Sequence, residues 1–319
     1  MNHLHLNPNP NLWKGRSSQE KEYWHQAIQL VDDLAIEEGK EKKIGILGYA
    51  GEEGVRRNQG RTGTSSGPEA IRKVMGPMAF HLSDKTLILD YGDILTLEDD
   101  MESSHALISE TVFQLLQNSH LPVLLGGGHD LALAHGRGIQ HYLSSKKEKL
   151  GIINLDAHFD LRTLVDGKGH SGSPFYQLSL EYPSNFHYLC LGIQKAANPK
   201  SLFDRAETLG ESWIDQDEFS LTNWDSVKES LLNFMDSVNK IYLSIDLDGF
   251  SSAFAPGVSA PSPMGFSPEL AFRVFELIAK SKKLISMDVV ELNPQFDQDR
   301  ATARLAARCV EFVLRNYLA

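Results

Sequence analysis

The sequence has little cysteine and no long apolar run. Its 319 residues include two cysteines, Cys190 and Cys309, which are too few for a disulfide framework or a cysteine-based metal cluster. No apolar stretch approaches the roughly 20 residues of a membrane-spanning helix, and the first residues, MNHLHLNPNPNLWKGR, lack the apolar core of a secretory signal. These absences predict a cytoplasmic protein with reduced thiols and no membrane partner.

Basic residues are also in short supply. Lys and Arg number 31 against 42 Asp and Glu, which gives a formal net charge of −11 at pH 7. A nucleic-acid-binding protein normally carries a basic stripe, so this balance argues against a nucleic-acid partner. Hydrophobic residues make up 41% of the chain, which is too much for a disordered protein and enough for a large buried core.

Short apolar runs alternate with amphipathic helix patterns along most of the chain, which predicts an α/β fold with a parallel sheet. The runs predict strands over Lys43–Tyr49, Thr86–Tyr91, Leu121–Leu125, Leu150–Leu155, His187–Gly192, Lys240–Ile245 and Lys283–Val290. The amphipathic patterns predict helices over Ser18–Lys42, Glu69–Met75, His105–Gln117, Trp224–Ser237, Pro268–Ala279 and Arg300–Tyr317.

The chain shows no internal repeat and no interdomain linker. Residues 1–20 are rich in Asn, Pro and His without periodicity, which predicts a loosely ordered N-terminal arm. Residues 21–319 are predicted to form a single domain. Two loops within it, Gly51–Pro68 and Ser251–Pro268, are long and rich in Gly, Ser and Pro, and such loops in a compact domain are usually functional.

Histidine and carboxylate residues follow four of the predicted strands directly. The sequences at these four places are GGGHD, DAHFD, DLD and ELNP. Ligands of open parallel sheets bind outside the carboxyl ends of the strands, so the four clusters predict one shared site. Alternate side chains of an extended chain point the same way, so we expect Asp156, His158 and Asp160 to project together, and likewise Asp246 and Asp248.

Such a cluster of buried carboxylates needs cations, because burying unpaired charge is very costly. Carboxylate and imidazole ligands without thiolate suit Mn²⁺, with Zn²⁺, Co²⁺ and Fe²⁺ as alternatives. Four aspartates and two histidines are too many for one ion that keeps an open position, and they fit two ions that share carboxylates. The predicted ligands are His129, Asp156, His158, Asp160, Asp246 and Asp248.

In this order, the motifs GGGHD, NLDAHFD, SIDLDGF and ELNP resemble those of the arginase/ureohydrolase family, over roughly residues 44–318. The resemblance implies a three-layer α/β/α fold with a central, mostly parallel sheet. It implies that the six predicted ligands hold a binuclear manganese centre, with two Mn²⁺ per subunit. Two such metals lower the pKa of a shared water, which supplies the nucleophile for hydrolysis of a guanidino or formimino carbon–nitrogen bond. The family's frequent trimers and hexamers also raise the prospect of a homo-oligomer.

The resemblance also implies roles for other residues. Asp160 matches a ligand that hydrogen-bonds the nucleophile and relays its proton, and Glu291 matches the position that pairs with the cationic substrate group. Many family members carry a His-Gly pair that serves as a proton shuttle. In the segment GHSGSPF, Ser171 takes the shuttle position and His170 stands one residue before it, so His170 is a candidate proton donor.

Two segments resemble the formimidoylglutamase branch of this family, GVRRNQGRTGTSSGPEAIR and APGVSAP. The implied reaction converts N-formimidoyl-L-glutamate and water to L-glutamate and formamide, late in histidine degradation. This small-molecule substrate has two carboxylates and needs local cations or hydrogen-bond donors. The candidates are Arg162 first, then Arg57, Arg61, Lys195 and Ser171.

Three alternatives stay open. A ureohydrolase of the agmatinase, arginase or guanidinobutyrase type would act on a guanidino substrate instead. A deacetylase of the same broad architecture would hold one zinc ion and generally lack the ligand equivalent to His129. A metal-binding scaffold protein would have lost catalysis, although all six ligand positions and Glu291 are filled.

Overall fold

The computed structural model describes residues 3–39, 42–83 and 85–319. The ten strands of these residues form one sheet in the order β1-β4-β3-β5-β10-β9-β6-β7-β8, and β2 also pairs with β4. Every named pair in the described chain is parallel except β1 with β4. The strands are β1 His5–Leu6, β2 Ile28–Leu30, β3 Lys43–Ala50, β4 Leu87–Leu95, β5 His120–Leu125, β6 Leu150–Leu155, β7 His187–Ile193, β8 Ser212–Asp215, β9 Lys240–Asp246 and β10 Leu284–Val290.

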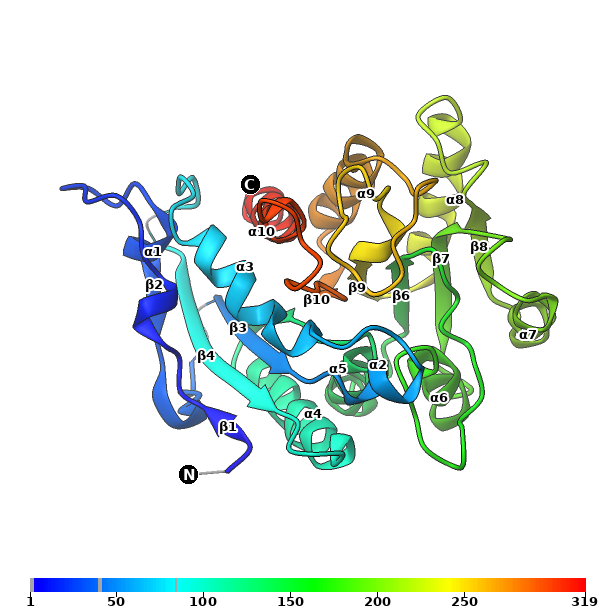
Figure 1. The fold of residues 1–319 in the computed structure, drawn as a ribbon, viewed down its shortest axis with the longest axis horizontal. Helices are drawn as coiled ribbons and strands as arrows, with labels where there is room; N and C mark the ends of the chain where they lie inside the picture. The colour runs from blue at the N-terminus through cyan, green and yellow to red at the C-terminus, as the bar shows by residue number, and fades with distance from the viewer. Residues whose placement is uncertain (1–2, 40–41, 84) are drawn as a thin grey trace.

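Helices cover both faces of this sheet (Figure 1). They are α1 Trp24–Ala27, α2 Glu53–Arg57, α3 Gly67–Met75, α4 Met101–Gln117, α5 Leu131–Ser144, α6 Pro174–Glu181, α7 Lys200–Leu209, α8 Trp224–Ser237, α9 Pro268–Lys280 and α10 Ala301–Tyr317. One core packs against α3, α8, α9 and α10, and a second core packs against α4, α5, α6 and α7. The predicted three-layer α/β/α fold is therefore confirmed. No described helix is long and apolar enough to cross a membrane.

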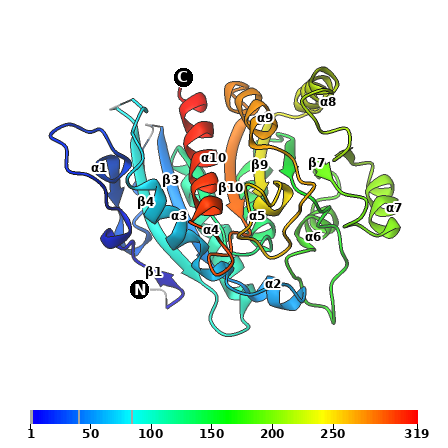
Figure 2. The same ribbon diagram turned by 45° about the horizontal axis from the view of Figure 1, so that its top comes forward.

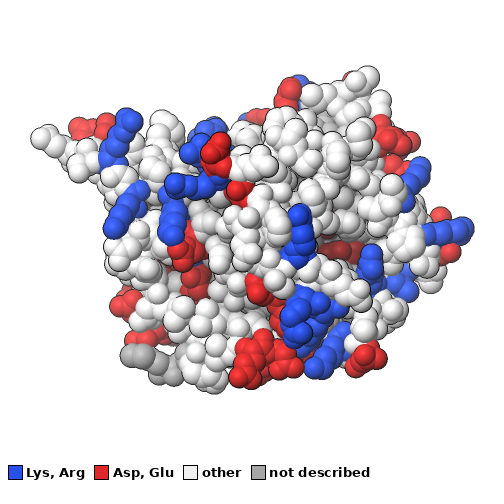
Figure 3. All heavy atoms as spheres, in the orientation of Figure 1, with Lys and Arg blue, Asp and Glu red and all other residues white. Residues whose placement is uncertain are grey.

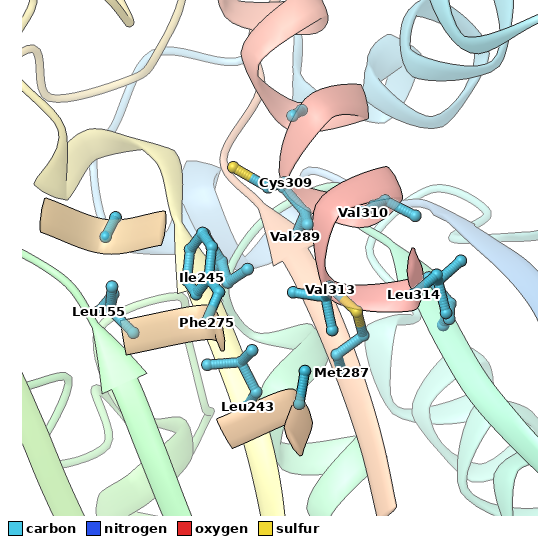
Figure 4. Close-up of a cluster of buried hydrophobic side chains, with 14 of the residues drawn as sticks. Leu155, Leu243, Ile245, Phe275, Met287, Val289, Cys309, Val310, Val313 and Leu314 are labelled. Atoms are coloured by element: carbon cyan, nitrogen blue, oxygen red, sulfur yellow. The ribbon is translucent and has the colours of Figure 1, made fainter. Parts of the chain in front are cut away.

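The alternation of side chains along each strand supplies both cores at once. On β9, Ile241, Leu243 and Ile245 join the first core, whereas Tyr242 joins the second. Figure 4 shows Leu243 and Ile245 near Phe275 of α9 and side chains of α10. Full burial of such an apolar side chain contributes about 1.5–3 kcal/mol, which is why continuous apolar runs form the centre of this sheet. Both cysteines are free thiols within these cores.

The predicted helix over Ser18–Lys42 is wrong for most of its length. In the described part of this range, the α-helix is limited to Trp24–Ala27, and Asp32–Leu34 form a 3₁₀ turn. Between them, Ile28–Leu30 form β2, which pairs in parallel with β4. Trp24 is fully buried and its ring meets the edge of Phe80. The apolar residues that resemble a helical face are therefore shared between one helical turn and a strand on the sheet.

The described part of the first 20 residues lies against the sheet. β1 pairs with β4, and Leu12 and Trp13 are buried. The indole Nε1 of Trp13 donates a hydrogen bond to Asp90 Oδ2 at 2.7 Å, and Asp90 is paired with the buried guanidinium of Arg72. The segment predicted as a loose arm is thus held against the sheet by the pairing of β1 with β4 and by the hydrogen bond from Trp13 to Asp90.

Candidate metal centre

The four polar clusters meet at one edge of the sheet. The strands β5, β10, β9 and β6 are neighbours in that order, and all three pairings are parallel. Their carboxyl ends therefore lie side by side. His129 follows β5, Glu291 follows β10, Asp246 ends β9, and Asp156 follows β6.

The predicted ligands form two overlapping groups. Within each group, the candidate ligand atoms lie within 4.8 Å of one another. The first group is His129, Asp156, Asp160 and Asp246, and the second is Asp156, His158 and Asp248. In the first group, His129 Nδ1 lies 2.9 Å from Asp160 Oδ2 and 3.0 Å from Asp246 Oδ2. In the second, His158 Nδ1 lies 3.2 Å from Asp248 Oδ2. Asp156 belongs to both groups, as a carboxylate shared by two ions would.

The hydrogen bonds of His129 fix which ring nitrogen faces the carboxylates. Its Nε2 lies 2.9 Å from Ser244 Oγ, and that hydroxyl donates to Asp288 Oδ1 at 2.7 Å. The single hydroxyl proton is therefore used, so Ser244 accepts from Nε2–H. In the neutral ring, Nδ1 therefore keeps its lone pair, and it is buried facing Asp160 and Asp246. A bare imidazole nitrogen aimed at converging carboxylates fits a metal ligand.

Asp288 lies behind this ligand as the centre of a buried polar network. Besides Ser244, it accepts hydrogen bonds from the hydroxyl of Tyr242 and from His135 Nδ1, the latter at 2.7 Å. All four side chains are fully buried. Such a network holds its members in one arrangement, because each would lose a partner by moving.

The local backbone differs from the extended chain that we expected at the aspartates. Asp156 follows the end of β6, and its Oδ1 accepts from the backbone N–H of His158 at 2.7 Å. Asp246 likewise accepts from the N–H of Asp248 at 2.8 Å, where the chain enters a short 3₁₀ turn. Asp160 has a left-handed φ of 51°. Tight turns, rather than strand alternation, bring these carboxylates together.

The glycines of GGGHD allow two loops to touch. Gly127 donates its N–H to the carbonyl of Tyr49 at 2.9 Å, and Gly128 donates to that of Gly51 at 3.1 Å. A Cβ on Gly127 would lie 2.1 Å from the carbonyl oxygen of Gly51, so no other residue fits this approach. The contact places the loop Gly51–Pro68 beside His129.

The donor set fits divalent cations. Burial, followed by the charge of Asp248, raises the pKa of Asp246 well above its ordinary value. Burial also raises the pKa values of Asp160 and Asp248, and Oδ1 of Asp248 is buried without a hydrogen-bond partner. Carboxylates crowded in this way fit divalent cations, which would favour their ionised forms.

A cavity of about 310 Å³ opens above these ligands. Both long loops form its walls, through Asn58–Arg61 on one side and Ser259 and Ala260 on the other. Figure 3 shows a hollow near α2 in which acidic side chains are visible, with basic side chains at its edge. The volume is at the lower end of the range of small-molecule sites, about 300–1,000 Å³.

Glu291 lines this cavity beside the ligands. Its Oε1 accepts from the backbone N–H of His129 at 2.8 Å, and its backbone has a φ of 67°. A left-handed φ is unfavourable for a residue of this size and is typical of functional sites. Burial, and next the charge of Asp248, raises the pKa of the Glu291 carboxyl to about 8. A cationic substrate group beside it would favour the ionised form.

Three of the predicted substrate-binding residues line the same cavity, Arg162, Arg61 and Ser171. Arg162 is exposed, and no carboxylate of the described chain lies within ion-pair distance of it. Arg61 has fewer donors available for a substrate, because its guanidinium already donates hydrogen bonds to the carbonyls of Val258 and Ser259. Ser171 Oγ accepts a hydrogen bond from Asn58 Nδ2 at 3.1 Å.

Arg57 and Lys195 do not line this cavity. The guanidinium of Arg57 donates to Glu102 and Glu53, at 2.6 and 2.7 Å, and lines an adjoining cavity of about 360 Å³. Lys195 Nζ lies 2.7 Å from Asp215 Oδ2 and belongs to a separate cavity. Both cations are thus held by carboxylates away from the predicted ligands.

His170 is buried behind the cavity wall and lines the adjoining cavity instead. Its Nδ1 accepts from the N–H of Gly172 at 3.1 Å, so its Nε2 carries the proton and donates to the carbonyl of Thr163 at 3.1 Å. Burial lowers its pKa, which favours this neutral form. Its predicted part in proton transfer stays a prediction.

The sequence interpretation missed Asn58, Gln59 and Ser259, which all line the metal-site cavity. Asn58 and Gln59 follow α2, where Gln59 has a left-handed φ of 62°. Their residue types carry no specific chemical signal. Their position in a long loop rich in Gly and Ser was the one indication available.

Known proteins resemble this chain over nearly its whole length. The family description "Arginase family" matches residues 42–314. The formimidoylglutamase of Clostridium tetani is 38% identical over 94% of this chain and 92% of its own length. That of Chromobacterium violaceum is 39% identical over 93% of this chain and 95% of its own length.

A solved structure shows the same fold. It is Trypanosoma cruzi formiminoglutamase determined with Mn²⁺, and it superposes with a TM-score of 0.79 at 26% identity. The match covers 90% of this chain and 97% of that one.

Proposed function

This chain belongs to the arginase family, and we propose that it hydrolyses N-formimidoyl-L-glutamate to L-glutamate and formamide. The observation that carries the proposal is a cluster of two histidines and four aspartates, of which His129, His158, Asp160, Asp246 and Asp248 line a cavity. Glu291 and Arg162 line the same cavity, and Arg162 has no carboxylate partner among the described residues. Relatives named formimidoylglutamase at 38 and 39% identity over nearly the whole chain support this substrate over a guanidino compound.

We propose that two Mn²⁺ bind per subunit. The two overlapping ligand groups, which share Asp156, support a pair of ions, and carboxylate with imidazole suits Mn²⁺. Two such ions, when bound, would lower the pKa of a water molecule and so supply a hydroxide nucleophile near neutral pH.

The residues of the chain then orient the substrate and move its protons. The Glu291 carboxylate pairs with the amidinium group and holds its carbon above the ligands. Asp160 lines the cavity and has a left-handed backbone conformation. Its carboxylate accepts a hydrogen bond from the hydroxide nucleophile and, after attack, passes the proton of that hydroxyl to the departing nitrogen. Water adds to the formimino carbon, the bond to the glutamate nitrogen breaks, and formamide leaves.

Arg162 is proposed to bind a carboxylate of the glutamate part. Its guanidinium has a fixed fork of donors that matches a carboxylate, and it borders both the metal-site cavity and the adjoining one. Ser171 and Arg61 shape the same wall, and Asn58 holds the Ser171 hydroxyl. Arg57 lines the adjoining cavity and not the metal-site cavity.

A substrate panel tests this function. The Mn²⁺-loaded protein is assayed with N-formimidoyl-L-glutamate, L-arginine, agmatine and 4-guanidinobutyrate, and formamide or urea is measured. We expect turnover of the first compound alone. Turnover of a guanidino compound in its place would contradict the proposed substrate, and turnover of none would contradict the proposed activity.

Metal content tests the centre separately. We expect two Mn²⁺ per chain by elemental analysis, and loss of metal and of most activity in His129→Asn and Asp248→Asn. One tightly bound Zn²⁺ per chain would favour the deacetylase alternative. Full turnover of either variant with one metal would contradict the proposed centre.

A further inference from the structure

A second cavity lies at the edge of the sheet opposite the metal centre. Its volume is about 700 Å³, more than twice the 310 Å³ of the metal-site cavity. Its lining includes the first residue of each of four strands, which are Lys43 of β3, His120 of β5, Lys240 of β9 and Leu284 of β10. The predicted metal ligands follow the other ends of β5 and β9, about 20 Å away along a strand of this length.

The views of the fold show the same separation. In Figure 2 the beginning of β3 and the end of α10 lie at the top of the molecule, whereas α2 lies at the bottom. Tyr317 and Leu318, at the end of α10, line the second cavity. α2 leads instead into the loop that walls the metal site. The two cavities are therefore separate sites.

Lysine dominates the polar lining of the second cavity. The lysines are Lys42, Lys43, Lys85, Lys146, Lys240 and Lys282. Glu148 is the one carboxylate among the described lining residues, and it lies 3.9 Å from Lys240. The other lysines have no carboxylate within ion-pair distance in the part of the chain that the structure describes. Six lysines on one cavity stand out in a chain whose net charge is −11.

The rest of the lining is largely apolar. Leu116, Leu121 and Ile285 form part of the wall, and the rings of Tyr142 and Tyr317 border it. The ammonium group of Lys146 lies 3.7 Å from the centre of the Tyr142 ring. A cavity with aliphatic and aromatic walls and several cations fits an anion that also carries an apolar or aromatic part.

The charge and size of the cavity narrow the class of ligand. A phosphate group carries about −1.5 to −2 charges near pH 7, whereas a carboxylate carries one, so several lysines match a chain of phosphates better than a carboxylic acid. Lysine binds phosphate as a compact point charge. Inorganic phosphate would use only a small part of about 700 Å³ and would leave the apolar wall uncovered.

We propose that this cavity binds a nucleoside di- or triphosphate. The phosphates lie among the lysines, and the base lies against the aliphatic and tyrosine side chains. Because the strands that border the cavity also lead to the metal centre, this is a second ligand site on the same sheet.

Calorimetric titration of the Mn²⁺-loaded full chain tests the ligand class. The titrants are ATP, ADP, pyrophosphate and adenosine, with Mg²⁺ in excess so that they do not extract the bound Mn²⁺. We expect the nucleotides to bind more tightly than pyrophosphate or adenosine, and their affinity to fall as salt rises from about 50 to about 300 mM. Absence of ATP binding at millimolar concentration, or equal affinity for ATP and pyrophosphate, would overturn the proposal.

A matched pair of variants tests the location. The double variant K42Q/K282Q removes two exposed lysines of the cavity, and K200Q/K228Q removes two exposed lysines of α7 and α8. We expect ATP affinity to fall about tenfold in the first variant and to change less than about twofold in the second, since both alter net charge equally. Unchanged affinity in K42Q/K282Q, or equal losses in both, would overturn the site. Thermal melting of each variant verifies that it is folded.

Discussion

At the scale of single residues, the hydrogen bonds behind His129 determine what the centre can bind. Ser244 accepts from Nε2–H because its own proton goes to Asp288, and in the neutral ring this leaves the Nδ1 lone pair facing the aspartates. The tautomer of this predicted ligand is therefore set by two side chains that are not themselves predicted ligands. Partners of this kind commonly change metal affinity by about 10- to 100-fold.

Replacement of Ser244 by Ala tests this arrangement. We expect Mn²⁺ affinity to fall by about 10- to 100-fold, because His129 loses the acceptor that fixes its tautomer. Competition with a metal-chelating dye measures the affinity. Ser286→Ala is the control, since Ser286 is also buried but bonds to His135 and the carbonyl of Pro122 instead of to a ligand. Equal Mn²⁺ affinities for the two variants would contradict the role of Ser244.

Arg162→Ala is expected to raise KM for N-formimidoyl-L-glutamate by about fivefold and to change kcat much less. The guanidinium is proposed to hold a remote carboxylate in ground state and transition state alike, and such uniform binding acts on KM. A partly exposed ion pair accounts for about 1 kcal/mol. Steady-state kinetics measure both constants, with Arg304→Ala on the exposed face of α10 as control. An unchanged KM would remove Arg162 from the substrate site.

His170→Asn separates proton transfer from loop positioning. Because both ring nitrogens are engaged by the backbone of Gly172 and Thr163, we expect the pH profile of kcat to keep its shape in this variant. An amide can replace both hydrogen bonds but cannot carry a proton. Loss of one limb of the profile would instead establish His170 as the proton carrier that the sequence predicts.

At this scale, the sequence predicted those site residues whose side chains have a specific chemistry, such as metal binding. Histidine and aspartate directly after buried strands predict a metal cluster, and the structure brings these six side chains together. The predicted reason for their convergence was incomplete. We expected the alternation of side chains along an extended strand to bring the carboxylates together, but turns at Asp156 and Asp246 do so instead. Asn58 and Gln59 could not be predicted, because their place in the wall depends on how a loop folds over a distant cluster.

At the scale of elements, the buried strands were the most predictable part. β6 has the predicted bounds, and β3, β5, β7, β9 and β10 begin and end within a residue or so of them. Their apolar runs are buried on both faces, so pattern and environment agree. The segment after Trp24 was misread because pairing of Ile28–Leu30 with β4 is a long-range interaction, which local periodicity does not report.

The N-terminal segment offers a test of how firmly a stretch with little regular structure is held to the sheet. Trp13→Ala is expected to lower the free energy of unfolding by about 3 kcal/mol, because the indole is buried and its N–H is bonded to Asp90. Chemical denaturation measures the change. Leu6→Ala is the control, since that side chain is 51% exposed. An unfolding free energy equal to that of the unmodified chain would show that the segment is loosely held.

At the scale of the whole molecule, charge is distributed unevenly. Four of the aspartates behind the net charge of −11 gather at the metal centre, and six lysines gather at the opposite edge of the sheet. Neither concentration follows from composition, which reports only totals. The sheet separates the two, since one lies beyond its carboxyl ends and the other at its amino ends.

Removal of metal is expected to destabilise the whole fold. At a free Mn²⁺ concentration about 100 times its Kd, each bound ion contributes about 2.7 kcal/mol, which for a chain of this size corresponds to about 4 °C in Tm. Thermal melting with and without a chelator measures the shift. Asp248→Asn is the comparison, and its Tm should respond less to the chelator. An equal response of the two proteins would contradict stabilisation through this centre.

The order of the strands also bears on how the chain reaches its native state. His129, Asp156, Asp246 and Glu291 are brought together by neighbouring strands that are far apart in sequence, with β5 pairing to β10 across more than 150 residues. Loop closure over such separations is slow, so contacts of this kind form late in folding. A chain whose central strands are paired in the wrong order or register cannot present both ligand groups. Tight metal binding is therefore a reporter of completed folding.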